Sequence, residues 1–402
     1  MVKLNRALIS GSFVLLIAFG IFNAIGALFH FSMVRMLSIV DYGILVVLFQ
    51  IIYTLSIFSE SIQAIITKYT LSVKNDNQLK SLYKKTFFKA SFIASLFYLI
   101  YLFASIPLAY LLKIPYLLVA FTGLIMFTIF FSPISRGVMQ GKKWFNSLGL
   151  NMIVEGFFKI TLSILFVFLG WKAFGAIFGV ILSTVFGFLF SLIQIRKVLK
   201  RKESQVNTVG IYSYTTPVFV IVFTILVFFS LDVFIAQIVF DKLTAGYYAI
   251  ASTLSKIVFF ATQPISKAMF PLSSDKKSKE SSNVFQNALG MISIIIIAAL
   301  VLFYFFPEFV IKVFKGSTLA ESASILFYLS VGTSLISIAN LFLFYKISRN
   351  EISGWKFLPL FVLVEILLLF WFSQNLLIFS LAFMTASAMF LWGAYMILGK
   401  EK

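Results

Sequence analysis

Long apolar stretches alternate with short polar connections along almost the whole chain of 402 residues. A bilayer core requires ~20 mostly apolar helical residues, and about twelve stretches approach or exceed that length. The pattern therefore predicts an all-α polytopic membrane protein with about twelve transmembrane helices. The predicted spans are Leu8–Phe31, Tyr42–Ile66, Thr86–Leu112, Pro115–Ser135, Phe145–Gly170, Ala173–Ile195, Tyr214–Phe240, Gly246–Ala268, Val284–Phe306, Ala320–Tyr345, Phe357–Phe372 and Leu376–Leu398. Phe357–Phe372 is short for a span.

The composition leaves little material for anything besides spans and short loops, since 61% of residues are hydrophobic and 12% are charged. Without cysteine, the chain has no disulfides, thiol catalysis or cysteine metal sites. His30 is the single histidine, so a histidine-based metal site lacks partners. No GxxxxGK[ST] phosphate loop is present. We expect no cofactor, no resident metal and no enzymatic activity.

Lysine and arginine lie mainly in every second connection, which predicts the orientation of the chain. Short loops rich in these residues stay on the cytoplasmic side of the membrane. With the N-terminus inside, 23 of the 33 cations fall in cytoplasmic segments and six fall outside. We therefore expect a multi-pass protein of the cell (plasma) membrane with both termini cytoplasmic. The net charge of +19 then reflects topology, and nucleic acid is not an expected partner.

The most charged connection, Arg196–Asn207, lies near the midpoint and predicts a boundary between two lobes. We expect residues 1–206 and 207–402 to form pseudo-symmetric six-helix lobes around a central cavity, a plan that several transporter classes use. A shift of 203 positions supports the repeat. It lays Leu37–Gly43 over Phe240–Gly246, each of which is a short outer turn that ends in glycine.

Several segments between about residues 30 and 275 resemble polysaccharide flippases of the MATE-like, or MOP, superfamily. They are Arg35–Gly43, Gly141–Phe145, Glu155–Lys159, Gly170, Gly175–Ile177, Leu231–Val233, Ala245–Ala249 and Met269–Pro271. The resemblance implies a two-lobed, V-shaped bundle that opens alternately to either side of the membrane. It also implies outward movement of polyprenyl-linked oligosaccharide.

Lysines inside predicted spans are candidate substrate ligands, because an ionised group at a helix centre costs ~2.5–3.5 kcal/mol on insertion scales. Lys159 follows Glu155 by four residues, so the two share a helix face. They either form an intrahelical ion pair, or they line a cavity in which Lys159 meets an anionic head group. Lys256 has no acid three or four positions away. It must face water, an acid of another helix, or an anion, and it is the preferred cavity residue.

Three acids within spans are candidates for coupling or gating: Glu60, Asp232 and Glu365. Acids that face a bundle interior can bind H⁺ or Na⁺ and so couple transport to an ion gradient. They can equally be structural partners of Lys256 or of helix hydroxyls. Asp232 is preferred because it lies in a segment that carries the family resemblance.

Three classes of function compete. A flippase for polyprenyl-phosphate- or pyrophosphate-linked oligosaccharide requires a cationic lumen and no catalytic constellation. A MATE-type cation-coupled multidrug exporter requires an acidic lumen, which would favour Glu60, Asp232 and Glu365 over Lys256. A membrane glycosyltransferase requires a sizeable outer loop, whereas the longest one here, Pro307–Leu319, has about a dozen residues. The resemblance and Lys256 favour the flippase.

Overall fold

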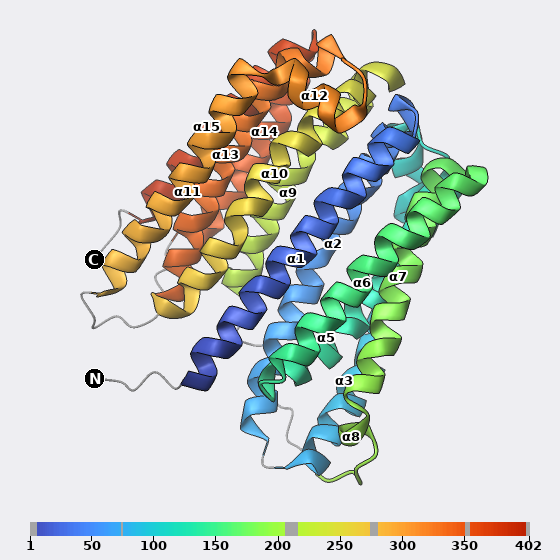
Figure 1. The fold of residues 1–402 in the computed structure, drawn as a ribbon, viewed down its shortest axis with the longest axis vertical. Helices are drawn as coiled ribbons and strands as arrows, with labels where there is room; N and C mark the ends of the chain where they lie inside the picture. The colour runs from blue at the N-terminus through green and yellow to red at the C-terminus, as the bar shows by residue number, and fades with distance from the viewer. Residues whose placement is uncertain (1–5, 74, 206–215, 274–279, 350–353, 399–402) are drawn as a thin grey trace. The chain divides into compact units, whose positions relative to one another are not determined.

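The computed structural model describes residues 6–73, 75–205, 216–273, 280–349 and 354–398. Its regular elements within these ranges are all helices (Figure 1). Their bounds are α1 Arg6–Met36, α2 Ile39–Ser72, α3 Asp76–Leu112, α4 Tyr116–Thr122, α5 Ile125–Gly141, α6 Phe145–Phe166, η1 Val167–Trp171, α7 Lys172–Gln194, α8 Arg196–Leu199, α9 Thr216–Val239, α10 Lys242–Leu272, α11 Glu280–Phe305, α12 Pro307–Lys315, α13 Ala320–Ser348, η2 Trp355–Phe357, α14 Leu358–Trp371 and α15 Leu376–Leu398.

Ten helical stretches in the described ranges are long and apolar enough to cross a membrane. One of them, Phe145–Gln194, contains both α6 and α7, which are joined through η1. Another, Tyr116–Gly141, consists of α4 and α5. Adding α14, which has only 14 residues, accounts for the twelve expected spans. The prediction of an all-α polytopic membrane protein is confirmed.

By its contacts, the chain divides into two compact units. The N-terminal unit comprises Met1–Phe29 and Leu55–Thr216, and the C-terminal unit comprises His30–Thr54 and Pro217–Lys402. The end of α1 and the first half of α2 thus pack with the later helices. The expected lobe boundary between residues 206 and 207 lies outside the described residues, as do both chain termini.

Helix ends recur at the offset of 203 residues that the sequence suggested. α1 ends at Met36 and α9 at Val239, while α2 begins at Ile39 and α10 at Lys242. The residues that follow α3 and α12, Lys113 and Gly316, keep the same spacing and both adopt the left-handed conformation, with φ of 56° and 90°. This recurrence agrees with an internal repeat.

Small residues bring helices close together in both units, as is typical of membrane helices. In the N-terminal unit, a Cβ added to Gly179 of α7 would lie 2.5 Å from the backbone nitrogen of Ser163 in α6. In the C-terminal unit, a Cβ on Gly43 of α2 would lie 3.0 Å from the Cα of Gly246 in α10. Gly43 and Gly246 are the two glycines that the 203-residue offset aligned.

The ends of α1 and α12 are fastened to each other within the C-terminal unit. The Arg35 guanidinium donates to the carbonyls of Val313 and Phe314 at the end of α12. The Lys315 ammonium donates to the Val34 and Leu37 carbonyls, at 2.6 and 2.8 Å. Each cation thereby satisfies carbonyl oxygens that the partner helix leaves open at its C-terminus.

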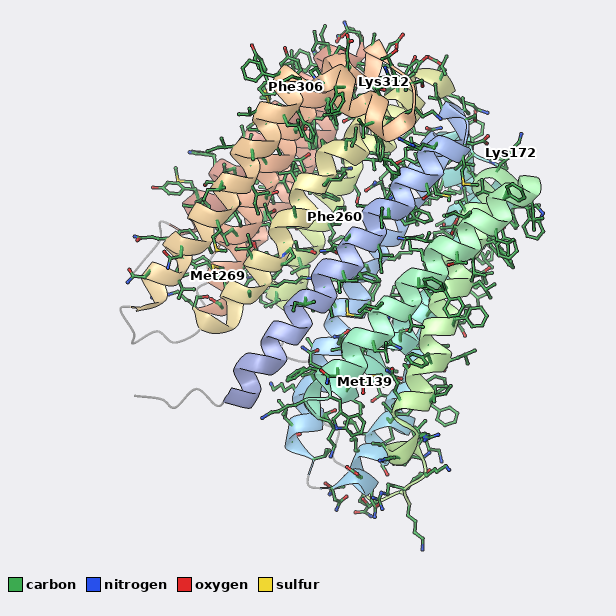
Figure 2. The ribbon with its side chains drawn as sticks, in the orientation of Figure 1. Met139, Lys172, Phe260, Met269, Phe306 and Lys312 are labelled. Carbon is green, nitrogen blue, oxygen red and sulfur yellow. The ribbon has the colours of Figure 1, made fainter. Side chains whose placement is uncertain are left out.

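Figure 2 labels Phe260, Met269, Phe306 and Lys312 among the side chains of the C-terminal unit. Phe306 and Lys312 lie at the end that carries α12, and Met269 lies toward the opposite end of α10. Phe306 is 56% exposed, whereas Met269 is 2% exposed. Between Gly246 and Met269, α10 carries Lys256, which is 3% exposed.

Candidate functional site

A buried ion pair joins α9 and α10 in the C-terminal unit. The Nζ atom of Lys256 lies 2.8 Å from Oδ1 of Asp232, and the two side chains are 3% and 1% exposed. The sequence left open whether Lys256 faces water, an anion or an acid of another helix. The structure places it against an acid of another helix, and that acid is the preferred coupling candidate, Asp232.

Within the described part of the chain, the donors that reach this carboxylate come from one face of α10. Tyr248, Ser252 and Lys256 are spaced four residues apart, so their side chains lie in a row on the helix. The Tyr248 and Ser252 hydroxyls donate to Oδ2 of Asp232 at 3.1 and 2.9 Å. The Lys256 ammonium also lies 4.7 Å from the centre of the Phe229 ring, at cation–π distance. The Asp232 carboxylate is therefore compensated by charge and by hydrogen bonds.

Glu365 of α14 lies near this pair and differs from Asp232 in its surroundings. Its side chain is fully buried, and neither carboxyl oxygen has a hydrogen-bond partner among the described residues. It is close enough to Asp232, Lys256 and Tyr248 to interact with them electrostatically. The structure thus gathers three of the six predicted site residues into one cluster with two acids and one lysine.

A second polar cluster joins α5, α6 and α7 in the N-terminal unit. Arg136 Nη2 donates to Glu155 Oε2 at 2.7 Å, and Arg136 Nε donates to Asn151 Oδ1 at 2.8 Å. The Asn151 amide in turn donates to the Gly187 carbonyl at 2.8 Å. A Cβ on Gly187 would lie 2.4 Å from Glu155 Oε2, so a larger residue at this position would displace the carboxylate. The Arg136 and Glu155 side chains are 14% and 12% exposed.

Lys159 interacts with the same carboxylate and with an aromatic ring. Its ammonium lies 4.5 Å from the centre of the Phe29 ring, and it interacts electrostatically with Glu155 one turn earlier on α6. Glu155 therefore faces two cations, Arg136 and Lys159. The cluster of these three ionised groups carries a net charge of +1.

Arg136 was missed by the sequence reasoning, which assigned it to a cytoplasmic connection after a span that ends at Ser135. In the structure, α5 continues to Gly141 and Arg136 is half-buried within it. Apolar periodicity could not reveal this, because a polar residue near the end of a span resembles the start of a loop. The signal was the pair Asn151 and Glu155, two polar residues on one face of α6 that require a partner.

Glu60, the remaining coupling candidate, is exposed on the part of α2 that belongs to the N-terminal unit. Asp232 and Glu365 belong to the C-terminal unit. Asp232 and Glu365 are therefore the two coupling candidates that share one unit. In the part of the chain that is described, no group of three or more His, Cys, Asp or Glu residues could hold a metal ion.

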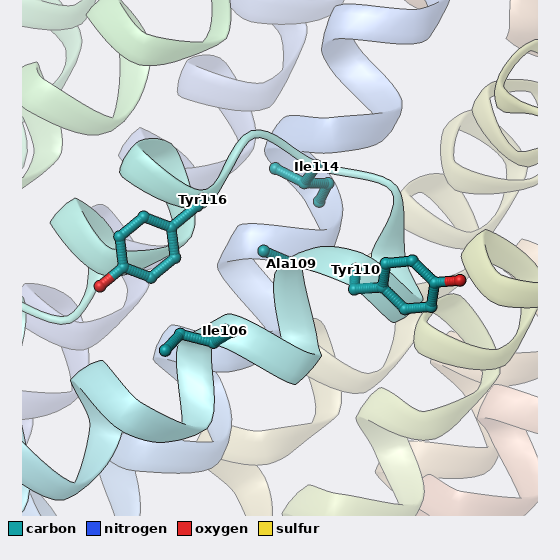
Figure 3. Close-up of a pocket in the computed structure, with 5 residues that line it drawn as sticks. All are labelled: Ile106, Ala109, Tyr110, Ile114 and Tyr116. Carbon is teal, nitrogen blue, oxygen red and sulfur yellow. The ribbon is translucent and has the colours of Figure 1, made fainter.

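An open, mostly apolar depression lies on the N-terminal unit where α3 meets α4. Its lining consists of Ile106, Ala109, Tyr110, Ile114 and Tyr116 (Figure 3). The two tyrosine hydroxyls point away from each other in this view. The lining contains no charged side chain that could pair with a phosphate group.

Comparison with known proteins places the chain among membrane proteins of polysaccharide biosynthesis. The profile of the family described as "Polysaccharide biosynthesis protein" matches residues 32–324. An uncharacterized membrane protein of Methanocaldococcus jannaschii is 25% identical over 349 residues, which cover 81% of this chain and 80% of the relative.

Solved structures with a similar fold include transporters of several kinds. An inward-facing multidrug resistance MATE family transporter of the MOP superfamily has a TM-score of 0.73 at 13% identity, covering 95% of this chain and 94% of that one. The lipid II flippase MurJ, in an inward closed conformation, has a TM-score of 0.73 at 14% identity over 96% and 88% of the two chains. A MOP superfamily transporter from Pyrococcus furiosus has a TM-score of 0.68 at 14% identity over 96% and 95%. At these identities, the matches show a shared fold.

Proposed function

Because the chain belongs to the polysaccharide biosynthesis protein family, we propose that it is a membrane transporter for a lipid-linked glycan. It moves polyprenyl-phosphate- or pyrophosphate-linked oligosaccharide from the inner to the outer leaflet by alternating access. The fold match to a lipid II flippase supports this proposal, since that protein's name states a lipid-linked substrate. The bilayer and the lipid-linked oligosaccharide are then the chain's partners.

The observation that carries the proposal is the positive cluster in the N-terminal unit. Two cations, Arg136 and Lys159, face one carboxylate, Glu155, inside membrane-spanning helices. An excess positive charge at membrane depth is costly unless an anion or water compensates it. A phosphate group of the substrate is such an anion. Lys159 is the more accessible of the candidate lysines, because it is half-buried whereas Lys256 is 3% exposed.

These surroundings make Lys159, rather than Lys256, the preferred candidate for the phosphate ligand. Lys256 can meet a phosphate only after leaving Asp232, to which it is bound at 2.8 Å. Lys159 and Arg136 already exceed the charge of their shared carboxylate. We therefore assign the phosphate contact to Lys159, with Glu155 and Arg136 holding it in place, and keep Lys256 as a second candidate ligand.

Transport by the purified protein in proteoliposomes tests this assignment. Lys159→Gln should slow the flipping of a lipid-linked oligosaccharide roughly 10- to 100-fold, since one charged hydrogen bond contributes ~1.5–3 kcal/mol. Lys159→Arg should retain part of the rate, because its charge survives while its geometry changes. Lys89→Gln provides a matched control, since Lys89 is an exposed lysine on α3 of the same unit. Normal flipping by Lys159→Gln would contradict the assignment.

The alternative is a MATE-type multidrug exporter, which the two buried acids of the C-terminal unit favour. Asp232 and Glu365 outnumber Lys256, and one of the similar structures is a multidrug resistance transporter. An exporter would carry a cationic dye in an Asp232-dependent manner and would tolerate Lys159→Gln. Dye export with those properties, together with no movement of lipid-linked oligosaccharide, would replace the flippase proposal.

A further inference from the structure

The cluster of Lys256, Asp232 and Glu365 has an unequal number of positive and negative groups. One ammonium faces two carboxyl groups, and all three side chains are at most 3% exposed. Asp232 accepts from the ammonium and from two hydroxyl donors, while the oxygens of Glu365 have no hydrogen-bond partner among the residues that the structure describes. An ionised carboxylate with no such partner is strongly disfavoured in a buried site. The neutral acid is the form of Glu365 that these surroundings accept.

We propose that Asp232 and Glu365 form a proton-binding site in which the two carboxyl groups share one exchangeable proton and compete for the Lys256 ammonium. In the observed arrangement, Asp232 is the carboxylate and Glu365 carries the proton. In the exchanged arrangement, the proton resides on Asp232 and the ammonium pairs with Glu365. The proton and the ammonium move in opposite directions, so the site keeps the same total charge and no other bond forms or breaks.

In their described residues, α9, α14 and α15 contain no acid besides Asp232 and Glu365. α9 has no ionisable residue besides Asp232, and α14 has none besides Glu365. From α10, Tyr248 and Lys256 interact with Glu365. On α15, which packs against α14, the one titratable side chain is the exposed Tyr395. η2, which also touches α14, contributes Lys356.

The charge of Lys256 also selects a proton over a metal cation. A metal ion bound between the two carboxyl groups would lie beside an ammonium that already compensates Asp232. A proton adds no second cation, because it neutralises Glu365 covalently. Binding of the proton does not depend on the proposed transport function, whereas its use as a coupling ion rests on that function.

Infrared spectroscopy of the purified full-length protein can detect the proton directly. A buried protonated carboxyl group gives a carbonyl stretching band that is separate from the carboxylate bands and shifts in D₂O. We expect this band in the wild type at neutral pH and its loss in Glu365→Gln. Glu321→Gln is the matched control, since Glu321 is an exposed glutamate in the first turn of α13, and it should retain the band.

Lys256→Met provides a second test that leaves both acids in place. Without the ammonium, both carboxyl groups should become neutral, so the protonated band should gain a second component, which Asp232→Asn then removes. A band that persists unchanged in Glu365→Gln, or that does not grow in Lys256→Met, would overturn the shared-proton site. Neither result bears on whether the protein flips lipids.

Transport measurements test the coupling step separately. In proteoliposomes, a pH gradient should accelerate flipping by the wild type, and Glu365→Gln should abolish this acceleration. Wild-type flipping that is insensitive to the gradient would overturn the coupling role. Absence of flipping in every variant, with the infrared band intact, would instead contradict the proposed function.

Discussion

Removal of the Lys256 ammonium should strongly destabilise the C-terminal unit, because it leaves the buried Asp232 carboxylate without its counter-charge. Lys256→Met keeps a long apolar side chain against Phe229 and deletes the charge that lies 2.8 Å from Oδ1. Removing one partner of a buried ion pair costs about 3–5 kcal/mol.

The free energy of protonating Asp232 in this variant sets an independent upper limit on the destabilisation. An aspartate with the reference pKa of ~3.9 takes up a proton at pH 7 at a cost of ~4 kcal/mol, at 1.36 kcal/mol per pH unit. This value agrees with the range for breaking a buried pair. Relative to the folded wild type, the folded variant then binds one more proton, so the destabilisation decreases as pH falls. The destabilisation should shrink by about 1.4 kcal/mol per pH unit between pH 7 and 4.

Reversible unfolding in detergent micelles, measured from pH 4.5 to 7.5, provides the assay. Lys312→Met is the matched control, since Lys312 is an exposed lysine of the same unit and exposed charges contribute ~1 kcal/mol or less. The double variant Lys256→Met/Asp232→Asn should recover much of the lost stability, because no uncompensated charge remains. A loss below ~1 kcal/mol for Lys256→Met, independent of pH, would refute the reasoning about this buried pair.

Three further predictions concern other parts of the molecule. Hydrogen bonds from the side chain and backbone of Thr244 hold the pKa of Asp241 below its usual value. Asp241→Ala should therefore lower the free energy of unfolding by about 1 kcal/mol at pH 7. In unfolding titrations, this difference between variant and wild type should vanish as pH falls below ~4. Gly179→Ala should lower the free energy of unfolding by about 1–3 kcal/mol through its clash with the α6 backbone. Gly20→Ala, which has open space around its Cβ, should not destabilise, and equal losses for both would contradict this explanation. A single cysteine at the exposed Lys202 should react with an impermeant thiol reagent only from the cytoplasmic side, and labelling from outside would overturn the predicted topology.

The sequence predicted the helices well because length and hydropathy are local properties of the chain. The short stretch Phe357–Phe372 corresponds to α14, and the expected turn before Gly246 became the Asp241 cap of α10. The partners of the charged residues could not be predicted in the same way. Neighbouring helices supply those partners, and periodicity on one helix does not say which neighbour lies opposite. For Lys256, the pattern could show only that no acid lay on its own helix.

The packing of the end of α1 and the start of α2 also could not be predicted from local sequence patterns. Hydropathy assigns Leu8–Phe31 and Tyr42–Ile66 to the first half of the chain, yet His30–Thr54 packs with the second half. Long-range contacts decide this assignment. The Arg35 and Lys315 side chains bind the ends of each other's helices across sequence separations of 279 and 281 residues. No local pattern around Arg35 contains that information.

The charge balance of the two clusters separates the roles of membrane potential and proton in the proposed transport. Moving one elementary charge through 100 mV changes the free energy by ~2.3 kcal/mol, so an inside-negative potential favours outward passage of a doubly charged pyrophosphate by ~4–5 kcal/mol. This driving force acts on the anion bound by the positive cluster of Lys159, Arg136 and Glu155. The proton of the Glu365 cluster adds to it without being required for it. We therefore expect Glu365→Gln to retain potential-dependent flipping in proteoliposomes while losing its response to a pH gradient. Loss of both responses in a variant that still binds substrate would show that the two clusters do not act separately.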